Sequence, residues 1–238
     1  MKIRTPLLPL LFLLSVLMGC TCLQGQTKNA IFQVSTIVSL LAADYDGKIT
    51  MPDLKKRGNF GIGTFDGLDG EMVAVDGKFY HVKENGVSNP AEDSMRTPFA
   101  FVTFFEADKT SSLEKSMNYK ELEQYLSGSL PNKKIFYAIK ISGDFNFIKV
   151  RSGPKQTKPY PPFGETQKQQ KVFEFRDLPG VMVGFLVPNL GYVNPPGYHF
   201  HFLSEDRKRG GHLLDCEIRK AKIEIDPISN FNLFLSED

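Results

Sequence analysis

The chain has 238 residues and a mass of 26.8 kDa, which fits one domain or two small ones packed together. Hydrophobic residues make up 41% and charged residues 24%, and this average composition excludes a disordered or a fibrous protein. The formal charge is +2, and two of the basic residues, Lys2 and Arg4, lie in an N-terminal leader. The rest of the chain is balanced, so it lacks the basic excess of a nucleic-acid-binding protein.

Residues 1–19 are typical of a signal peptide, because a short basic region precedes the apolar run Leu7–Met18. That run is too short to span a bilayer stably. It ends in Leu17-Met18-Gly19-Cys20, which resembles a bacterial lipobox, where the cysteine is acylated and becomes the new N-terminus. We therefore expect an exported protein, either a lipoprotein of the cell envelope anchored at Cys20 or a secreted protein, with a linker over residues 20–29.

The next segments predict an N-terminal β-rich domain over residues 30–165. The periodicity of Ile31–Ala43 fits a strand or a helix, and its length favours a helix that ends at Asp44. Two apolar runs around the turn Asp76-Gly77 predict a hairpin of Met72–Val75 and Lys78–Val82. Phe99–Phe105 is typical of a further strand.

Helical spacing of apolar residues predicts one clear helix over Ser112–Leu126. Ile135–Ile141 and Phe145–Val150 are predicted as two strands, and Arg151–Gly164, which holds four prolines, as irregular chain.

A C-terminal β domain is expected over residues 166–238. Val172–Phe175 and Val181–Val187 are typical of strands, and Tyr198–Phe234 is nearly all β in pattern. The sequence thus predicts an α+β fold of two β-rich lobes, with mixed or antiparallel sheets and few helices.

Two features of the sequence resemble metal or redox sites but have simpler interpretations. Asp44–Ile49 imitates the middle of a calcium-binding EF-hand loop, but its first ligand position is Ala42 and its last is Asp53, so we interpret it as a turn. Cys22 and Cys216 have no zinc-knuckle or redox spacing, and Cys216 fits a buried small residue in a strand.

Three of the four histidines fall within fourteen residues: His199, His201 and His212. In a strand, His199 and His201 project from one face, about 6.6 Å apart, and the neighbouring Phe200 and Phe202 point the other way. A polar turn leads to His212, which approaches the same face if the two strands pair. Three imidazoles with no fourth protein ligand are typical of a catalytic metal site with an open position, on the C-terminal sheet facing the lobe interface.

Three motifs, in this order, resemble the bacterial alpha-acetolactate decarboxylases. Gly58–Phe65, followed by Gly67–Met72 and Asp76–Tyr80, looks like the N-terminal signature of that family. Arg151-Ser152 with Gln156–Pro161 resembles its arginine-bearing loop, and Pro196–Phe202 with Gly210-Gly211-His212 resembles its zinc segment.

The resemblance implies that His199, His201 and His212 hold one zinc ion (Zn²⁺), without an organic cofactor. It implies the conversion of (S)-2-acetolactate, a 2-hydroxy-3-oxo acid, to (R)-acetoin and carbon dioxide. Loss of carbon dioxide leaves an electron pair on an enediolate, whose charge a Lewis acid stabilises. A homodimer formed through the N-terminal sheets is also implied.

By the same resemblance, Arg151 holds the substrate carboxylate, Glu71 is a candidate for proton transfer, and Thr64 is a polar contact beside it. Family members continue into a C-terminal tail that returns a glutamate to the metal. This chain ends soon after its last strand, and Glu237 is expected to come too early to be that residue, so the tail is expected to be missing.

Two other functions fit parts of the sequence. His199-x-His201-xxx-Glu205 copies the core of the cupin motif, which would make the protein a different metalloenzyme, although no histidine follows His212. The chain is otherwise compatible with an exported, non-enzymatic lipoprotein that binds a structural metal or a ligand.

Overall fold

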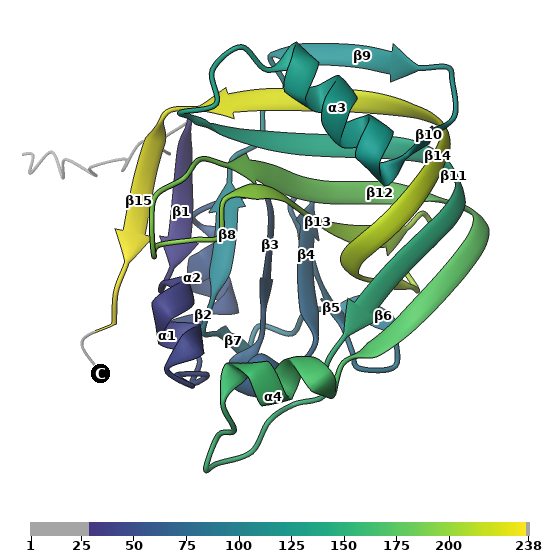
Figure 1. Cartoon of the computed structure of the whole chain (residues 1–238). Coiled ribbons are helices and arrows are strands. Elements are labelled where there is room, and N and C mark those ends of the chain that lie inside the picture. Colours follow the sequence, from purple (N-terminus) through teal and green to yellow (C-terminus); the bar gives the residue numbers. More distant parts are fainter. Residues whose placement is uncertain (1–28, 237–238) are drawn as a thin grey trace, which may run out of the picture.

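The computed structural model describes residues 29–236. The expected signal peptide, Cys20, Cys22, the linker up to residue 28, and Glu237 lie outside these residues. Within them, two large β-sheets pack face to face (Figure 1). No helix of the described part combines the length and the apolar character needed to cross a bilayer.

The first sheet has seven strands. Neighbouring strands in it are antiparallel, except for β1 and β15, which are parallel. In spatial order the strands are β15 (Asn230–Phe234), β1 (Ala30–Val34), β8 (Ala100–Thr103), β3 (Phe60–Thr64), β4 (Glu71–Val75), β5 (Lys78–Val82) and β6 (Ser88–Pro90). The hairpin predicted around Asp76-Gly77 is confirmed as β4 and β5, and a strand is confirmed within Phe99–Phe105.

The second sheet is antiparallel and has six strands. They are β9 (Lys109–Leu113), β10 (Met117–Asn118), β11 (Phe136–Ser152), β12 (Lys171–Val187), β13 (Gly197–Ser204) and β14 (Gly210–Ile228). Strand β13 pairs with both β12 and β14, so this sheet closes on itself at one end. A small separate pair consists of β2 (Ile49–Thr50) and β7 (Arg96–Thr97).

The described helices are short: α1 (Ile37–Leu41), α2 (Met51–Lys55), α3 (Tyr119–Ser129), α4 (Phe163–Lys168) and the single 3-10 turn η1 (Asp66–Leu68). Together with the two sheets they confirm the predicted α+β fold of β-rich lobes with few helices.

The helix favoured for Ile31–Ala43 is wrong in its first half, which is strand β1. Ser35 ends that strand with a φ of 61°. The Thr36 side chain then accepts a hydrogen bond from the Ser39 backbone and starts the five-residue helix α1. The hydrophobic periodicity fitted a strand or a helix equally well. The backbone conformation of Ser35 and the cap at Thr36 decide where the strand ends and the helix begins.

The predicted helix over Ser112–Leu126 begins too early. Asn118 and Glu121 form a capping box, which starts α3 at Tyr119. The residues before it pair as strands β9 and β10 with the long strand β14.

Strands β11 and β12 are each longer than expected. Ile135–Ile141 and Phe145–Val150 were predicted as two strands, but they belong to one strand of 17 residues, and the same holds for Val172–Phe175 and Val181–Val187. Gly143 and Gly180 face each other in the middle of the pair. A Cβ atom at Gly143 would lie 2.2 Å from the Lys220 carbonyl oxygen, so glycine permits the close approach of β14 there.

Sheet membership does not follow the order of the chain. Strand β11 lies before residue 166 but belongs to the six-stranded sheet, and β15 lies at the C-terminal end but belongs to the seven-stranded sheet. The division into domains at residues 165 and 166 stays a prediction about folding units.

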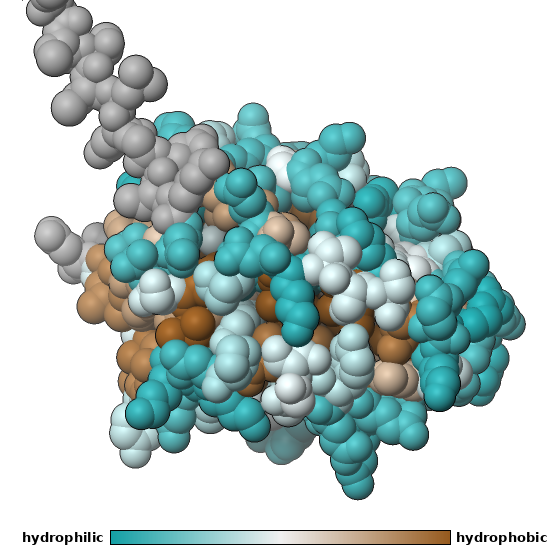
Figure 2. All heavy atoms as spheres, turned by 90° about the horizontal axis from the view of Figure 1, so that it is seen from above, coloured by the Kyte–Doolittle hydropathy of each residue, from teal (hydrophilic) through white to brown (hydrophobic). Residues whose placement is uncertain are grey.

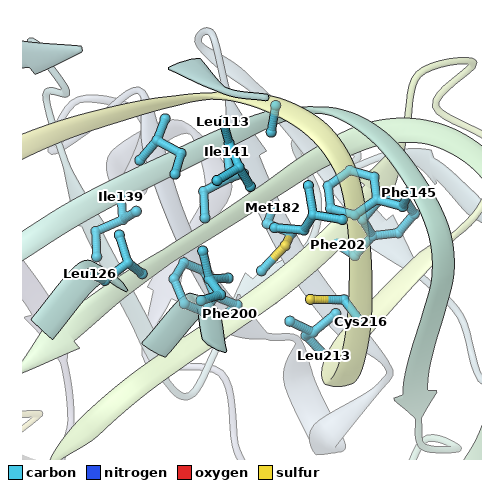
Figure 3. Close-up of a cluster of buried hydrophobic side chains, with 14 of the residues drawn as sticks. Leu113, Leu126, Ile139, Ile141, Phe145, Met182, Phe200, Phe202, Leu213 and Cys216 are labelled. Atoms are coloured by element: carbon cyan, nitrogen blue, oxygen red, sulfur yellow. The ribbon is translucent and has the colours of Figure 1, made fainter. Parts of the chain in front are cut away.

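Most buried apolar side chains lie in three layers, and a smaller cluster contains Leu40, Tyr45 and Phe99. One lies between the two sheets, and one covers the outer face of the seven-stranded sheet under α2. The third lies between the six-stranded sheet and α3 and includes Phe145, Phe200, Phe202 and the buried Cys216 (Figure 3). The face seen in Figure 2 is mainly hydrophilic, and much of its hydrophobic surface shows in the gaps between polar side chains.

We expect Phe145→Ala to lower the free energy of unfolding by about 3–5 kcal/mol, because it empties a fully buried site. Phe145 is 0% exposed and meets Phe202 edge to face, with ring centroids 5.4 Å apart. Urea denaturation measures the loss. The control is Phe147→Ala, whose ring is only partly buried and contacts Arg176. Equal losses in the two variants would contradict the assigned core.

Candidate active site

A row of polar side chains crosses three strands of the six-stranded sheet. His201 on β13 is paired with His212 on β14, and His212 is also paired with Arg151 on β11. Directly opposite residues of antiparallel strands project from the same face. The pairing therefore brings together three residues that are far apart in sequence.

The three C-terminal histidines converge as predicted. Nε2 of His199 lies 3.3 Å from Nδ1 of His212, and one nitrogen from each ring falls within 4.8 Å of the others. Their side chains face the seven-stranded sheet, while Phe200 and Phe202 point into the core under α3. The predicted alternation along β13, and the approach of His212, are confirmed.

The histidines have the protonation that a metal requires. Nδ1 of His201 lies 2.8 Å from the Met72 carbonyl oxygen, so it donates its proton there and leaves Nε2 as a lone-pair donor. Burial lowers the pKa of His199 to about 4, and burial with the neighbouring positive groups lowers the pKa of His201 and His212 well below the ordinary value. Neutral imidazoles, close together, fit a metal ion such as zinc.

Glu71 reaches these imidazoles from the opposite sheet. It begins strand β4, is 9% exposed, and places Oε2 3.5 Å from Nε2 of His201. Burial raises the pKa of its carboxyl to about 8, and the charge of Arg151 acts in the opposite direction. The structure thus brings a buried carboxyl next to the histidine cluster.

Thr64 stands beside Glu71 and fixes the turn that leads to it. The Thr64 hydroxyl donates to the Gly70 carbonyl at 2.7 Å. Gly70 has a φ of 67°, and its amide donates to the Gly153 carbonyl at 3.2 Å. The turn before Glu71 is therefore bonded to the segment that follows Arg151.

Arg151 brings a positive charge to the cavity without a partner for it. Its Nε atom is buried and makes no hydrogen bond in the described chain. Among residues 29–236, no carboxylate oxygen lies within 4.0 Å of its guanidinium nitrogens, so Arg151 forms no ion pair. An anion in the cavity would satisfy both the charge and the donor.

These side chains line one cavity of about 370 Å³ between the sheets. Its wall is largely apolar, with Ile62, Phe101, Phe185 and Val187, and its charged and titratable groups are Glu71, Arg151 and the three histidines. Further lining residues come from the segments outside the sheets: Ile37, Leu40, Phe163, Thr166, Gln167, Gln170, Asn194, Pro195 and Pro196.

Sequence reasoning missed most of that outer wall. Helix α4 and the pair Asn194-Pro195 belong to no motif, and their contribution comes from the path of the chain between long strands. Gln156 and Pro196 are exceptions, since they belong to the arginine-bearing loop motif and the zinc-segment motif and also line the cavity.

The remaining candidate groups lie elsewhere. The fourth histidine, His81, is buried against Phe65 with Nε2 3.5 Å from Asp69, and it is not part of the histidine group. Glu205 is exposed in the turn after β13, so it does not supply the acidic ligand of a cupin motif. In the loop that resembled an EF-hand, the Asp46 carboxylate accepts hydrogen bonds from Lys158 and Tyr160.

Comparison with known proteins agrees with this geometry. The family model described as alpha-acetolactate decarboxylase matches residues 31–238. The alpha-acetolactate decarboxylase of Methanosarcina mazei is 47% identical over 88% of this chain and 73% of its own length, and that of Brevibacillus brevis is 41% identical over 87% and 73%. The crystal structure of the Bacillus subtilis strain 168 enzyme superposes with a TM-score of 0.86 at 38% identity, covering 88% of this chain and 90% of that one. The chain is therefore an enzyme of the alpha-acetolactate decarboxylase family.

Proposed function

We propose that the protein converts (S)-2-acetolactate to (R)-acetoin and carbon dioxide in the cavity between its sheets. The observation that carries the proposal is the meeting, in one cavity, of three neutral imidazoles, an unpaired arginine and a buried carboxyl in a chain of this family. The first group fits a metal, the second a carboxylate, and the third a proton transfer.

His199, His201 and His212 would hold the metal, which we propose to be zinc. When bound, zinc would supply Lewis acidity toward the oxygen atoms of the substrate. The hydrogen bond from His201 to the Met72 carbonyl fixes the ring that approaches Glu71.

Arg151 would bind the substrate carboxylate. Its planar guanidinium offers paired donors, and its buried Nε has no partner among the described residues. When carbon dioxide leaves, the electron pair passes to the neighbouring ketone as an enediolate, and the same guanidinium would donate hydrogen bonds to that charge. Arg151 therefore acts on both the ground state and the developing anion.

Glu71 would hold the proton that the former carboxylate-bearing carbon receives. Its Oε2 is on the cavity side of β4, close to His201 and shielded from bulk water. Protonation from one fixed side would give one enantiomer of acetoin. Thr64 would keep Glu71 in place through its bond to the turn at Gly70.

Incubation of the zinc-loaded protein with racemic acetolactate tests the proposal. We expect acetoin and carbon dioxide in equal amounts, and chiral chromatography should show (R)-acetoin. Tight binding of a 2-hydroxy acid without any turnover would contradict decarboxylation and favour a non-enzymatic binding protein.

We further propose that the protein is exported, with a lipid anchor at Cys20, and that it forms a homodimer. The leader sequence supports the first point, and family resemblance supports the second. Cell fractionation and sedimentation test them, and a cytoplasmic protein or a monomer would contradict them.

We expect His201→Ala to lower bound zinc well below one ion per chain, because it removes one of three ligands. Metal analysis of the dialysed protein measures this. The matched control is His81→Gln, which changes the histidine outside the group and should keep full occupancy. Full occupancy in His201→Ala would overturn the ligand assignment.

Arg151→Lys should lower kcat/KM at least about tenfold, which is about 1.4 kcal/mol, while the thermal midpoint barely moves. Lysine keeps the charge but loses the paired donors. Arg176→Lys, at an exposed position of β12, is the control and should match the unchanged protein. A lower midpoint with normal activity would make Arg151 structural.

Glu71→Gln should stabilise the metal-free protein, and more at pH 8 than at pH 5. Burial raises the folded pKa to about 8 from an ordinary 4.5, so the folded carboxyl keeps a proton that the unfolded one releases. Stability is therefore lost as pH rises between these values, and glutamine avoids the loss. Urea denaturation in the presence of a chelator measures it, with the exposed Glu165→Gln as control. A gain that does not depend on pH would contradict the buried carboxyl.

A further inference from the structure

One polar side chain of the cavity is not explained by the groups above. Gln170 is the second of two residues between α4 and β12, and its backbone amide donates to the Gln167 carbonyl. The next residue, Lys171, forms the last pair of the β11–β12 ladder with Ser152. Gln170 therefore stands where this ladder ends, and its side chain lines the cavity.

The Gln170 side chain lies across Gly153. A Cβ atom at Gly153 would be 3.2 Å from Cγ of Gln170 and 3.8 Å from its Nε2, so the glutamine fills space that a side chain at residue 153 would take. Arg151 is two residues before Gly153, and Arg151, Gly153 and Gln170 all line the same cavity. The side chain of Gln170 therefore lies against the chain that leaves β11, on the cavity that Arg151 also lines.

The carbonyl oxygen of this amide is buried and unpaired. Oε1 of Gln170 has no hydrogen-bond partner in the described chain, and the same holds for the buried Nε of Arg151. A buried polar group that is left unpaired destabilises the structure, because it has lost its hydrogen bonds to water. Two such atoms, one acceptor and one donor, on one cavity point to a ligand that supplies the missing partners.

Two other amide side chains of the cavity wall are already engaged through their nitrogen atoms. Nε2 of Gln156 donates to the Pro154 carbonyl and to Oε1 of Gln169. Nδ2 of Asn194 donates to Oε1 of Gln33. Among the amide side chains of the described cavity wall, only Gln170 has an oxygen that is both buried and without a hydrogen-bond partner.

We propose that Gln170 is a substrate-binding residue that recognises the 2-hydroxyl group of a 2-hydroxy acid whose carboxylate is held by Arg151. Oε1 accepts the hydrogen bond of the hydroxyl, and Nε2 is free to donate to the adjacent carboxylate. The hydroxyl and the carboxylate of such an acid are on neighbouring atoms, which matches an acceptor and a donor on one cavity wall. This assignment rests on the proposed function and adds the group that selects the hydroxyl.

Equilibrium binding of two non-reacting probes to the zinc-loaded protein tests the proposal. 2-Hydroxy-2-methylpropanoate and 2-methylpropanoate differ only in the hydroxyl. We expect the unchanged protein to bind the hydroxy acid at least tenfold more tightly, and Gln170→Leu to lose most of that preference while keeping its zinc. Gln124→Leu, at an exposed position of α3, is the matched control and should keep the preference.

Steady-state kinetics with acetolactate provides a second readout. Gln170→Leu should raise KM about tenfold with a much smaller effect on kcat, because it removes binding rather than a reacting group. Gln170→Glu keeps the shape and covers the case in which the leucine variant does not fold. It should also raise KM, since its carboxylate repels that of the substrate.

The outcomes separate the two proposals. If the unchanged protein produces no acetoin, the proposed function is wrong. Binding of the two probes still decides whether Gln170 binds the hydroxyl group. If acetoin forms but both Gln170 variants keep the original KM and the preference for the hydroxy acid, the assignment of Gln170 is wrong.

Discussion

The hydrogen bond from Nδ1 of His201 to the Met72 carbonyl joins the two sheets at the point where the chemistry is expected. Met72 is next to Glu71 on β4, and His201 is paired with His212 on β13 and β14. One bond therefore sets the tautomer of a histidine that could hold a metal, and the distance between the histidine cluster and the carboxyl of the other sheet. A relative shift of the sheets would disturb both.

Apolar packing between the sheets gives these polar groups their properties. Phe101 meets Phe185 edge to face, with ring centroids 4.7 Å apart, and both side chains also line the cavity. The same exclusion of water keeps the imidazoles neutral and raises the pKa of Glu71. The guanidinium of Arg151 forms no ion pair with a carboxylate among residues 29–236, so its charge stays available for a ligand.

Local signals in the sequence predicted the parts of the site that lie close together in the chain. Alternation around His199 and His201 indicated one face, and a Gly-Gly turn before His212 indicated the return strand. Arg151, Glu71 and Thr64 came only from family motifs, because no local pattern shows that residues from β3, β4 and β11 share a cavity. The helix start at Tyr119 and the break at Ser35 depended on capping and backbone geometry, which hydrophobic periodicity does not detect. No local pattern indicated Gln170, since its position on the cavity depends on its contact with Gly153, just beyond the end of the β11–β12 ladder.

The parallel pairing of β1 with β15 has a consequence for how the molecule is made. Ala30 is paired with Asn230, so β1 cannot pair with β15 until the ribosome has synthesised two hundred further residues. Contacts between such distant segments form slowly, because the intervening chain must first be ordered. During synthesis β1 therefore has an edge that its final neighbour cannot yet cover, and nascent chains in this state are exposed to mispairing with one another.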